Sequence, residues 1–99
     1  MNCKRKGTRL ERKTIHRLTA AGYTCIRSAA SLGPFDILAI NPLGIRCIQV
    51  KSNDWPRPEE RESLRNAVRM LPPNAFVECW RWNDGAREPL IKGLEELEI

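Results

Sequence analysis

Two neighbouring runs of mainly apolar residues, 35–40 and 45–52, stand out near the middle of the chain. The residues between them, 41–44, include asparagine, proline and glycine, which favour turns. Two apolar runs rich in β-branched residues around such a turn predict a β-hairpin. With the turn at residues 41–44, Ile40 faces Ile45 across the two strands.

Three polar residues interrupt these strands. Counting back from the turn places Asp36 opposite Gln49, and directly opposed residues of an antiparallel pair project to one side of the sheet. Side chains alternate along a strand, so Lys51 shares the face of Gln49. A sheet core does not need these groups, and burying them without partners would be unfavourable. The hairpin is therefore predicted to bring a carboxylate, an amide and an ammonium group together at one end.

A helical pattern precedes the hairpin. Thr8 and Glu11 match a capping box, which predicts a helix from Thr8 to about Ala21 that Gly22 ends, after a mobile basic arm at residues 1–7. At about 100° per residue, one arc of this helix is apolar and the opposite arc is basic. The apolar arc contains Leu10, Thr14, Ile15, Leu18 and Ala21, and the basic arc contains Arg9, Arg12, Lys13, His16 and Arg17. Glu11 falls within the apolar arc, so it either completes the cap or reaches a site on the sheet.

The same signals predict the remaining elements. Besides the hairpin, we expect a strand, a loop of small residues, another strand and a short edge strand, in that order at residues 23–28, 29–34, 76–82 and 89–92. Pro58 and the glutamates after it predict a second helix that ends before Pro72. An apolar tail at 94–99 is expected to pack on the domain or on a partner subunit. The order αβββαβ predicts an α/β fold, with helices flanking a mixed central sheet.

The length and composition of the chain narrow its class. We expect residues 1–99 to form a single domain with a modest core. No run approaches the ~20 apolar residues of a membrane span, and there is no signal-peptide pattern. The four cysteines are widely spaced, which indicates reduced core residues of a cytoplasmic protein and not a zinc site or disulfide framework.

The net charge of +5 is concentrated near the N-terminus. Residues 1–17 contain seven basic residues and one acidic residue, whereas residues 18–99 carry a net charge of −1. A concentrated basic patch is typical of a surface that binds phosphate groups, and also of a solvated helix face. Nucleic acid is therefore one of the partners that the charge distribution allows.

The polar groups form a recognisable chemical set. Glu11, Asp36 and Gln49 offer two carboxylates and an amide oxygen, hard ligands suited to Mg²⁺ or Mn²⁺. Lys51 beside them can orient or activate a water molecule, or stabilise a developing oxyanion. A divalent ion, a water molecule and a lysine next to a basic surface suit phosphodiester hydrolysis. The chain offers neither a Cys/His pair for thiol catalysis nor a glycine loop that cradles phosphate.

Five segments follow one another in a characteristic order: Lys4–Thr8 with Glu11 and Arg12, Ala21–Tyr23, Arg27–Ser31, Pro34–Ala39 and Ile48–Ser52. In order and spacing they resemble the archaeal-type Holliday junction resolvases of the PD-(D/E)XK nuclease superfamily. The resemblance covers residues 4–53 well and the rest only by the order of elements. It implies a restriction-endonuclease-like fold, a Mg²⁺ cofactor that Mn²⁺ could replace, and a homodimer that cuts two strands of a four-way DNA junction.

The resemblance also implies residue roles. Glu11, Asp36 and Gln49 would bind the metal together with the backbone carbonyl of Val50, and Lys51 would be the catalytic lysine. Arg12, Arg27 and Ser31 match family residues that contact the DNA backbone or support the site. With the basic N-terminal residues, the expected DNA-binding set is Lys4, Arg5, Lys6, Arg9, Arg12, Lys13, Arg27 and Ser31.

The sequence departs from the family pattern at two positions and is shorter than a typical resolvase. Phe35 separates Pro34 from Asp36, and Gln49 replaces the usual acid. We expect a metal-dependent, structure-selective DNA endonuclease that resolves four-way junctions. Two alternatives remain open: another small nuclease of the superfamily acting on flaps, nicks or duplex ends, or a DNA-binding module without catalysis. Glu11, Asp36 and Lys51 are intact, which argues against the second alternative.

Overall fold

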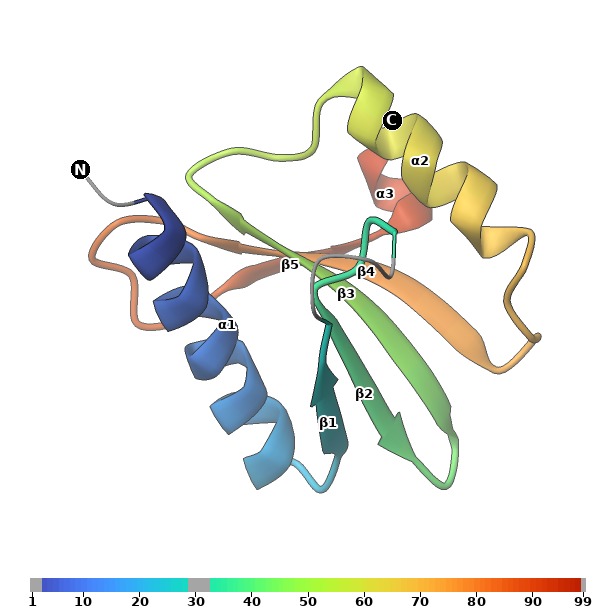
Figure 1. Cartoon of the computed structure of the whole chain (residues 1–99), viewed down its shortest axis with the longest axis horizontal. Helices are drawn as coiled ribbons and strands as arrows, with labels where there is room; N and C mark the ends of the chain where they lie inside the picture. The colour runs from blue at the N-terminus through green and yellow to red at the C-terminus, as the bar shows by residue number, and fades with distance from the viewer. Residues whose placement is uncertain (1–2, 29–32, 99) are drawn as a thin grey trace.

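The computed structural model describes residues 3–28 and 33–98, with side chains from residue 7 on. Its elements, shown in Figure 1, are α1 (Cys3–Ala20), β1 (Thr24–Arg27), β2 (Ile37–Asn41), β3 (Gly44–Ser52), α2 (Pro58–Val68), β4 (Ala75–Trp82), β5 (Leu90–Gly93) and α3 (Leu94–Leu97). The strands form one sheet in the order β1-β2-β3-β4-β5. The β3–β4 pair is parallel and the other described pairs are antiparallel, so the predicted mixed sheet is confirmed.

The β2–β3 hairpin has the predicted register. Ile40 pairs with Ile45, and Asn41 pairs with Gly44 at the turn. The side-chain oxygen of Asn41 accepts a hydrogen bond from the backbone N–H of Leu43 at 2.9 Å, which closes the turn locally. Gly44 has a φ of 154°, and a Cβ there would collide with the backbone oxygen of Asn74. Glycine is therefore required where the hairpin meets the start of β4.

Helix α1 covers one face of the sheet, and α2 and α3 cover the other, as Figure 1 shows. Alternation along β3 divides the core between the two faces, because Ile48 packs toward α1 whereas Cys47 packs toward α2. The α1 face buries Leu10, Leu18, Ile37, Ala39, Ile48, Trp80 and Trp82. The α2 face buries Phe35, Cys47, Leu64, Val77, Cys79 and Leu97.

Helix α1 begins at Cys3, so the predicted start at Thr8 is wrong, and residues 3–7 are helical instead of forming an arm. Lysine and arginine are good helix formers, which allows the basic segment to extend the helix. Thr8 does not cap the helix; its hydroxyl oxygen accepts a hydrogen bond from Nη2 of Arg27 at 3.2 Å. Glu11 consequently lies inside the helix, where it is free of any capping role.

The apolar C-terminal tail and the two tryptophans of β4 are both packed within the domain. Leu97 of α3 is buried in the α2-face core, so the apolar tail packs on the domain itself, while Ile99 lies outside the described residues. Trp80 and Trp82 are 4% and 2% exposed, so neither indole is available to a partner surface. Helix α1 covers both indoles, which the alternating strand pattern alone could not indicate. Within the described ranges, no helix is long and apolar enough to cross a membrane.

Candidate active site

Asp36 directly precedes the Ile37–Ile48 pair, the last pair of the hairpin ladder, so its predicted position opposite Gln49 stays a prediction. Its backbone N–H donates to the carbonyl of Ile48 at 2.8 Å, which ties it to β3 one residue out of the ladder register. Its side-chain Oδ2 accepts a hydrogen bond from the backbone N–H of Val50, also at 2.8 Å. Two bonds to the neighbouring strand thus fix both the backbone and the carboxylate of Asp36.

The electrostatic surroundings of Asp36 show which charges meet at this point. Burial raises the pKa of Asp36, and although the Val50 N–H lowers it, the negative charge of Glu11 raises it further. Lys51 lowers the pKa and Glu60 raises it, both more weakly. The carboxylate of Asp36 therefore lies within electrostatic range of all three side chains. A partly buried carboxylate near other acids is stabilised by any cation that binds beside it.

Gln49 is 8% exposed and shares the α2 face with Lys51. Its side-chain oxygen Oε1 is buried and has no hydrogen-bond partner within the described residues. Leaving a buried carbonyl oxygen without a partner costs about 1–3 kcal/mol, so such an atom in a native protein is usually satisfied by an ordered water molecule, an ion or another ligand. An amide oxygen in this state is a hard donor available to a ligand.

Lys51 forms an ion pair that the sequence analysis did not anticipate. Its Nζ lies 3.1 Å from Oε2 and 3.2 Å from Oε1 of Glu60, in the first turn of α2. Oε1 of Glu60 also accepts a hydrogen bond from the backbone N–H of Arg57 at 3.1 Å. Burial pushes the pKa of Glu60 up, but the Arg57 N–H and the Lys51 ammonium outweigh it and hold this pKa below its usual value. Glu60 is therefore a charged member of the site.

Glu11 reaches the site from α1, and its carboxylate binds another predicted site residue. Nε of Arg27 donates to Oε1 of Glu11 at 2.8 Å, and the two side chains are 45% and 20% exposed. Glu11 is thus one of the charges that raise the pKa of Asp36, while its own charge is partly balanced by Arg27. The structure brings Glu11 and Arg27 together, although the sequence assigned them to metal and to DNA separately.

The oxygen donors at this end of the hairpin fit a hard divalent cation. They are the carboxylates of Asp36 and Glu11 and the unpaired amide oxygen of Gln49, all oxygen atoms of the kind that Mg²⁺ and Mn²⁺ prefer, while the backbone carbonyl of Val50 stays a prediction. Among the described residues, no three His, Cys, Asp or Glu side chains gather closely enough to hold a metal by themselves. The fit therefore depends on the amide and carbonyl oxygens as well as on the acids.

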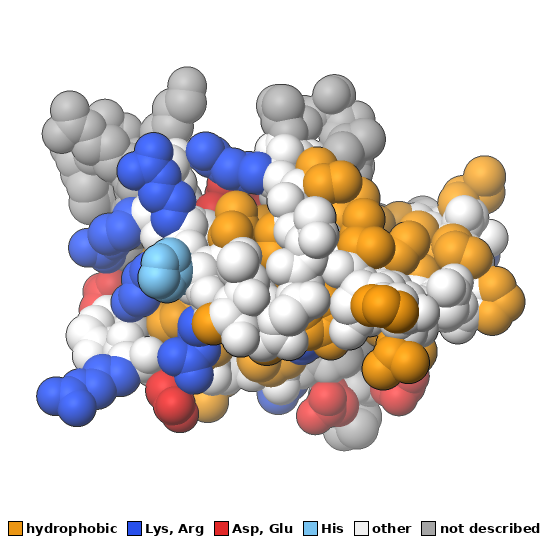
Figure 2. Space-filling model, turned by 90° about the horizontal axis from the view of Figure 1, so that it is seen from below, with side chains coloured by type: hydrophobic (Ala, Val, Ile, Leu, Met, Phe, Trp, Pro, Cys, Tyr) orange, Lys and Arg blue, Asp and Glu red, His pale blue; other side chains and the backbone are white. Residues whose placement is uncertain are grey.

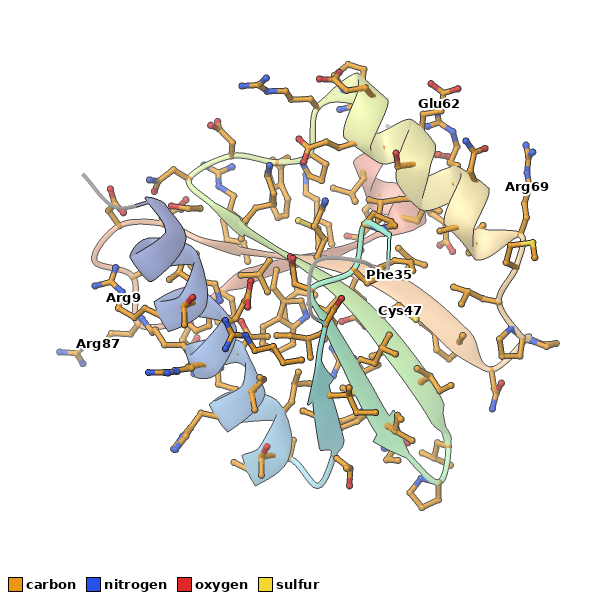
Figure 3. The ribbon with its side chains drawn as sticks, in the orientation of Figure 1. Arg9, Phe35, Cys47, Glu62, Arg69 and Arg87 are labelled. Atoms are coloured by element: carbon orange, nitrogen blue, oxygen red, sulfur yellow. The ribbon has the colours of Figure 1, made fainter. Side chains whose placement is uncertain are left out.

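Thiol chemistry does not contribute here. Cys79, which pairs in register with Gln49, is fully buried, and burial raises its pKa to about 12. A thiol with such a pKa stays protonated at neutral pH and is a poor nucleophile. Cys47 is buried as well, and Figure 3 shows it close to Phe35 in the core beneath α2. Both residues fit the predicted role of reduced core cysteines.

The exposed side of α1 carries the predicted basic arc. Figure 2 shows Lys and Arg side chains concentrated on one side of the molecule and hydrophobic side chains on the other. On α1, Arg9, Arg12, Lys13 and Arg17 are exposed. Lys13 lies over the ring of Trp82, with Nζ 4.5 Å from the ring centre, and Arg17 contacts Glu88 at 3.2 Å. The side chains of Lys4, Arg5 and Lys6, and the whole of Ser31, lie outside the described residues.

Comparisons with known proteins agree with this geometry. The structure of Hjc from Archaeoglobus fulgidus, described as a Holliday junction resolvase from an archaeal hyperthermophile, matches with a TM-score of 0.74 and 26% sequence identity. The match covers 91% of this chain and 74% of that chain. The fold is thus that of an α/β domain of the resolvase type. No curated protein sequence matches the chain.

The family can also be stated. The family model described as archaeal Holliday junction resolvase (Hjc) matches residues 2–60, which is more than half of the chain. The chain therefore belongs to the archaeal Holliday junction resolvase family, as its sequence segments suggested. The matched residues include both arms of the hairpin, the first helix and the first turn of α2.

Proposed function

We propose that this chain is a metal-dependent, structure-selective DNA endonuclease that resolves four-way junctions by phosphodiester hydrolysis. The observation that carries the proposal is the convergence of Asp36, Gln49 and Lys51 at the end of the β2–β3 hairpin, with Glu11 within electrostatic range. Membership of the resolvase family gives this arrangement its chemical meaning. The other functions weighed from the sequence are distinguished by the experiment below.

Each group has a distinct role in this proposal. Asp36, Glu11, Gln49 and the carbonyl of Val50 would hold a divalent ion, Mg²⁺ or Mn²⁺, which when bound would polarise the scissile phosphate and lower the pKa of a water molecule. The Val50 N–H holds the Asp36 carboxylate in place at 2.8 Å. Lys51 brings a positive charge that can orient the attacking water or stabilise charge developing on the phosphate.

The basic arc of α1 is proposed to bind the DNA backbone. Arg9, Arg12, Lys13 and Arg17 are exposed on the same helix that carries Glu11 toward the site. Phosphate groups held by this arc would lie on the outer face of α1, on the helix whose inner side carries Glu11. Lys4, Arg5 and Lys6 extend the same helix by one turn and are proposed to add to this contact, as is Ser31.

We also propose that the enzyme acts as a homodimer, because cutting two symmetry-related strands of a junction needs two sites related by a two-fold axis. Exposed apolar side chains supply a possible surface, among them Phe76 of β4 and Ile91 of β5, which are 58% and 44% exposed. Both line a hollow of about 730 Å³ together with residues of α2 and α3. Arginines and glutamates also line this hollow, so a second copy would meet charges of both signs there.

The test is a cleavage assay with labelled four-way junction, flap, nicked duplex, intact duplex and single strand in the presence of Mg²⁺ or Mn²⁺. We expect paired cuts in the four-way junction. The variant Asp36→Asn should abolish cleavage and leave DNA affinity nearly unchanged, because it removes a metal-ligand charge and no phosphate contact. Preferential cutting of flaps or nicks would show that these structures, and not the four-way junction, are the substrate. Tight junction binding without cleavage by the parent protein would assign a non-catalytic role.

A further inference from the structure

Helix α2 contributes a charged residue to a site that otherwise consists of α1 and the hairpin. Both carboxylate oxygens of Glu60 lie within 3.2 Å of Nζ of Lys51, and within the described residues no other acceptor of Lys51 is found. The two side chains are only 30% and 24% exposed, so the pair is partly shielded from solvent. Such a pair restricts the ammonium more than a fully exposed ion pair does.

The glutamate is itself held in place. Its Oε1 accepts the backbone N–H of Arg57 at 3.1 Å, so the start of α2 fixes the carboxylate before Lys51 contacts it. Leu64, which is fully buried, holds α2 against the sheet one turn further on. The position of the lysine ammonium is therefore tied to the docking of α2, and not only to strand β3.

Lys51 also needs an anionic partner that holds its ammonium group in one position. Lysine has a flexible side chain with a compact charge, and by itself it does not hold one geometry. In a site with an acid at position 49, that acid would stand on the same strand face as Lys51, two residues away. Gln49 offers no charge, and the Asp36 carboxylate, which lies within electrostatic range of Lys51, accepts the backbone N–H of Val50. Glu60 provides the anionic partner from the opposite direction.

We propose that Glu60 is the positioning residue of Lys51: its carboxylate, anchored at the start of α2, holds the lysine ammonium at the catalytic end of the hairpin. This inference rests on the proposed nuclease function for its kinetic meaning, but the contact itself can be tested without cleavage. Glu60 acts through Lys51, which both of its carboxylate oxygens contact, and not through the metal.

The variant Glu60→Gln separates this role from the role of Glu60 in the helix start. Glutamine can still accept the Arg57 N–H, as glutamine does at this position of a capping box, but it has no charge and only one oxygen. Glu62→Gln is the matched control, because it removes the same charge from the same helix, and Figure 3 shows Glu62 on the outer side of α2. Any general effect of charge on DNA binding should appear in both variants.

The first measurement is the single-turnover cleavage rate of a bound four-way junction at saturating Mg²⁺. We expect Glu60→Gln to lower this rate roughly tenfold or more, since small displacements of a catalytic group are costly. Junction affinity and the Mg²⁺ midpoint should stay as in the parent, and Glu62→Gln should change none of them. In a Lys51→Ala background, Glu60→Gln should lower the residual rate no further, because the residue acts through the missing lysine.

The second measurement needs neither metal nor DNA. In protein labelled with ¹⁵N-lysine, the ammonium signal of Lys51, assigned by its loss in Lys51→Arg, should be observable and restricted in the parent. It should broaden or become mobile in Glu60→Gln and stay unchanged in Glu62→Gln. An unchanged ammonium signal in Glu60→Gln would overturn the inference. So would a shifted Mg²⁺ midpoint with a normal saturated rate, which would assign Glu60 to the metal instead. If the parent cleaves no DNA, the nuclease proposal fails, and the ammonium signal still decides whether Glu60 holds Lys51.

Discussion

Replacing Gln49 with glutamate places a new carboxylate between Ile48 and Val50, the two residues that bond Asp36, at a position that is 8% exposed. Side chains at opposed or diagonal positions on antiparallel strands are about 5–8 Å apart. At such separations, with an effective dielectric constant of about 20, two unit charges repel by roughly 2–3 kcal/mol. Burial already raises the pKa of Asp36, so the folded protein tolerates little further negative charge there.

Without metal, we therefore expect Gln49→Glu to lower the free energy of unfolding by at most about 3 kcal/mol at neutral pH. The sign of the pH dependence follows from the raised pKa. A carboxyl group whose pKa is higher in the folded than in the unfolded state binds its proton more tightly when folded. The destabilisation should be absent at pH values below the ordinary carboxyl pKa of about 4, and it should grow as the pH rises through the folded pKa.

A divalent ion should reverse this effect, because the third carboxylate then strengthens metal binding. Each tenfold gain in affinity adds about 1.4 kcal/mol of stability at a fixed metal concentration well above the dissociation constant. The variant should accordingly cleave at lower Mg²⁺ than the parent, with little gain at saturation. Gln49→Ala should need more metal and should be slower throughout, since it removes the amide oxygen that has no other partner.

Two assays check these expectations. Urea unfolding followed by tryptophan fluorescence, at several pH values with and without Mg²⁺, gives the free energy of unfolding of the parent and the variants. Asn66→Asp, on the exposed side of α2, is the control for an added charge. Mg²⁺ titration of the cleavage rate gives the metal midpoints of the parent and both variants. Identical midpoints in all three proteins would refute position 49 as a ligand. A parent that cuts at no Mg²⁺ or Mn²⁺ concentration, with cutting restored in Gln49→Glu, would make Gln49 the mark of a lost site.

Three further expectations concern DNA, the core and assembly. Changing Arg9 and Lys13 to glutamine should weaken junction binding and reduce the salt slope by roughly one to two units, since each phosphate contact contributes about 0.9; an unchanged slope would place the DNA elsewhere. Thr14→Val should lower the free energy of unfolding by about 1–3 kcal/mol, because Nε1 of Trp82 loses its 2.9 Å bond to the Thr14 hydroxyl, whereas Thr14→Ser should be milder. The parent should have a dimeric mass at micromolar concentration and Phe76→Asp a monomeric one; paired cutting by a monomeric parent would contradict the dimer.

The parts of the site that the sequence predicted well are those fixed by short-range pairing. The turn at residues 41–44 determines the register, because every step back from it advances both strands by one residue. This count predicts that Asp36 faces Gln49, and alternation places Lys51 on the face of Gln49. The buried arc of α1 with Leu10, Thr14 and Leu18 was equally predictable from the helical period.

The parts that the sequence did not predict depend on contacts between distant elements. The Glu60–Lys51 pair requires α2 to fold back over β3, and no local pattern indicates which glutamate of its first turn would face the sheet. The bond between Arg27 and Glu11 joins β1 to α1 in a similar way. A partly buried pair between Arg46 and Glu78 on neighbouring strands, at 2.7 Å, was also missed, because the parallel pairing of β3 with β4 decides it.

The site therefore has two parts: one is held by pairing within the hairpin, and the other is held by a contact between distant elements. The donors Asp36, Gln49 and Val50 are held by pairing within a single hairpin, so their geometry depends on bonds close to the chemistry. The ammonium of Lys51 is held by Glu60, whose position depends on α2, and the buried side chain of that helix is Leu64. Loosening α2 would therefore release the lysine while the metal donors stay in place. The charge that position 49 lacks is thus found on α2, outside the sheet, so the position of the Lys51 ammonium depends on how α2 packs against β3.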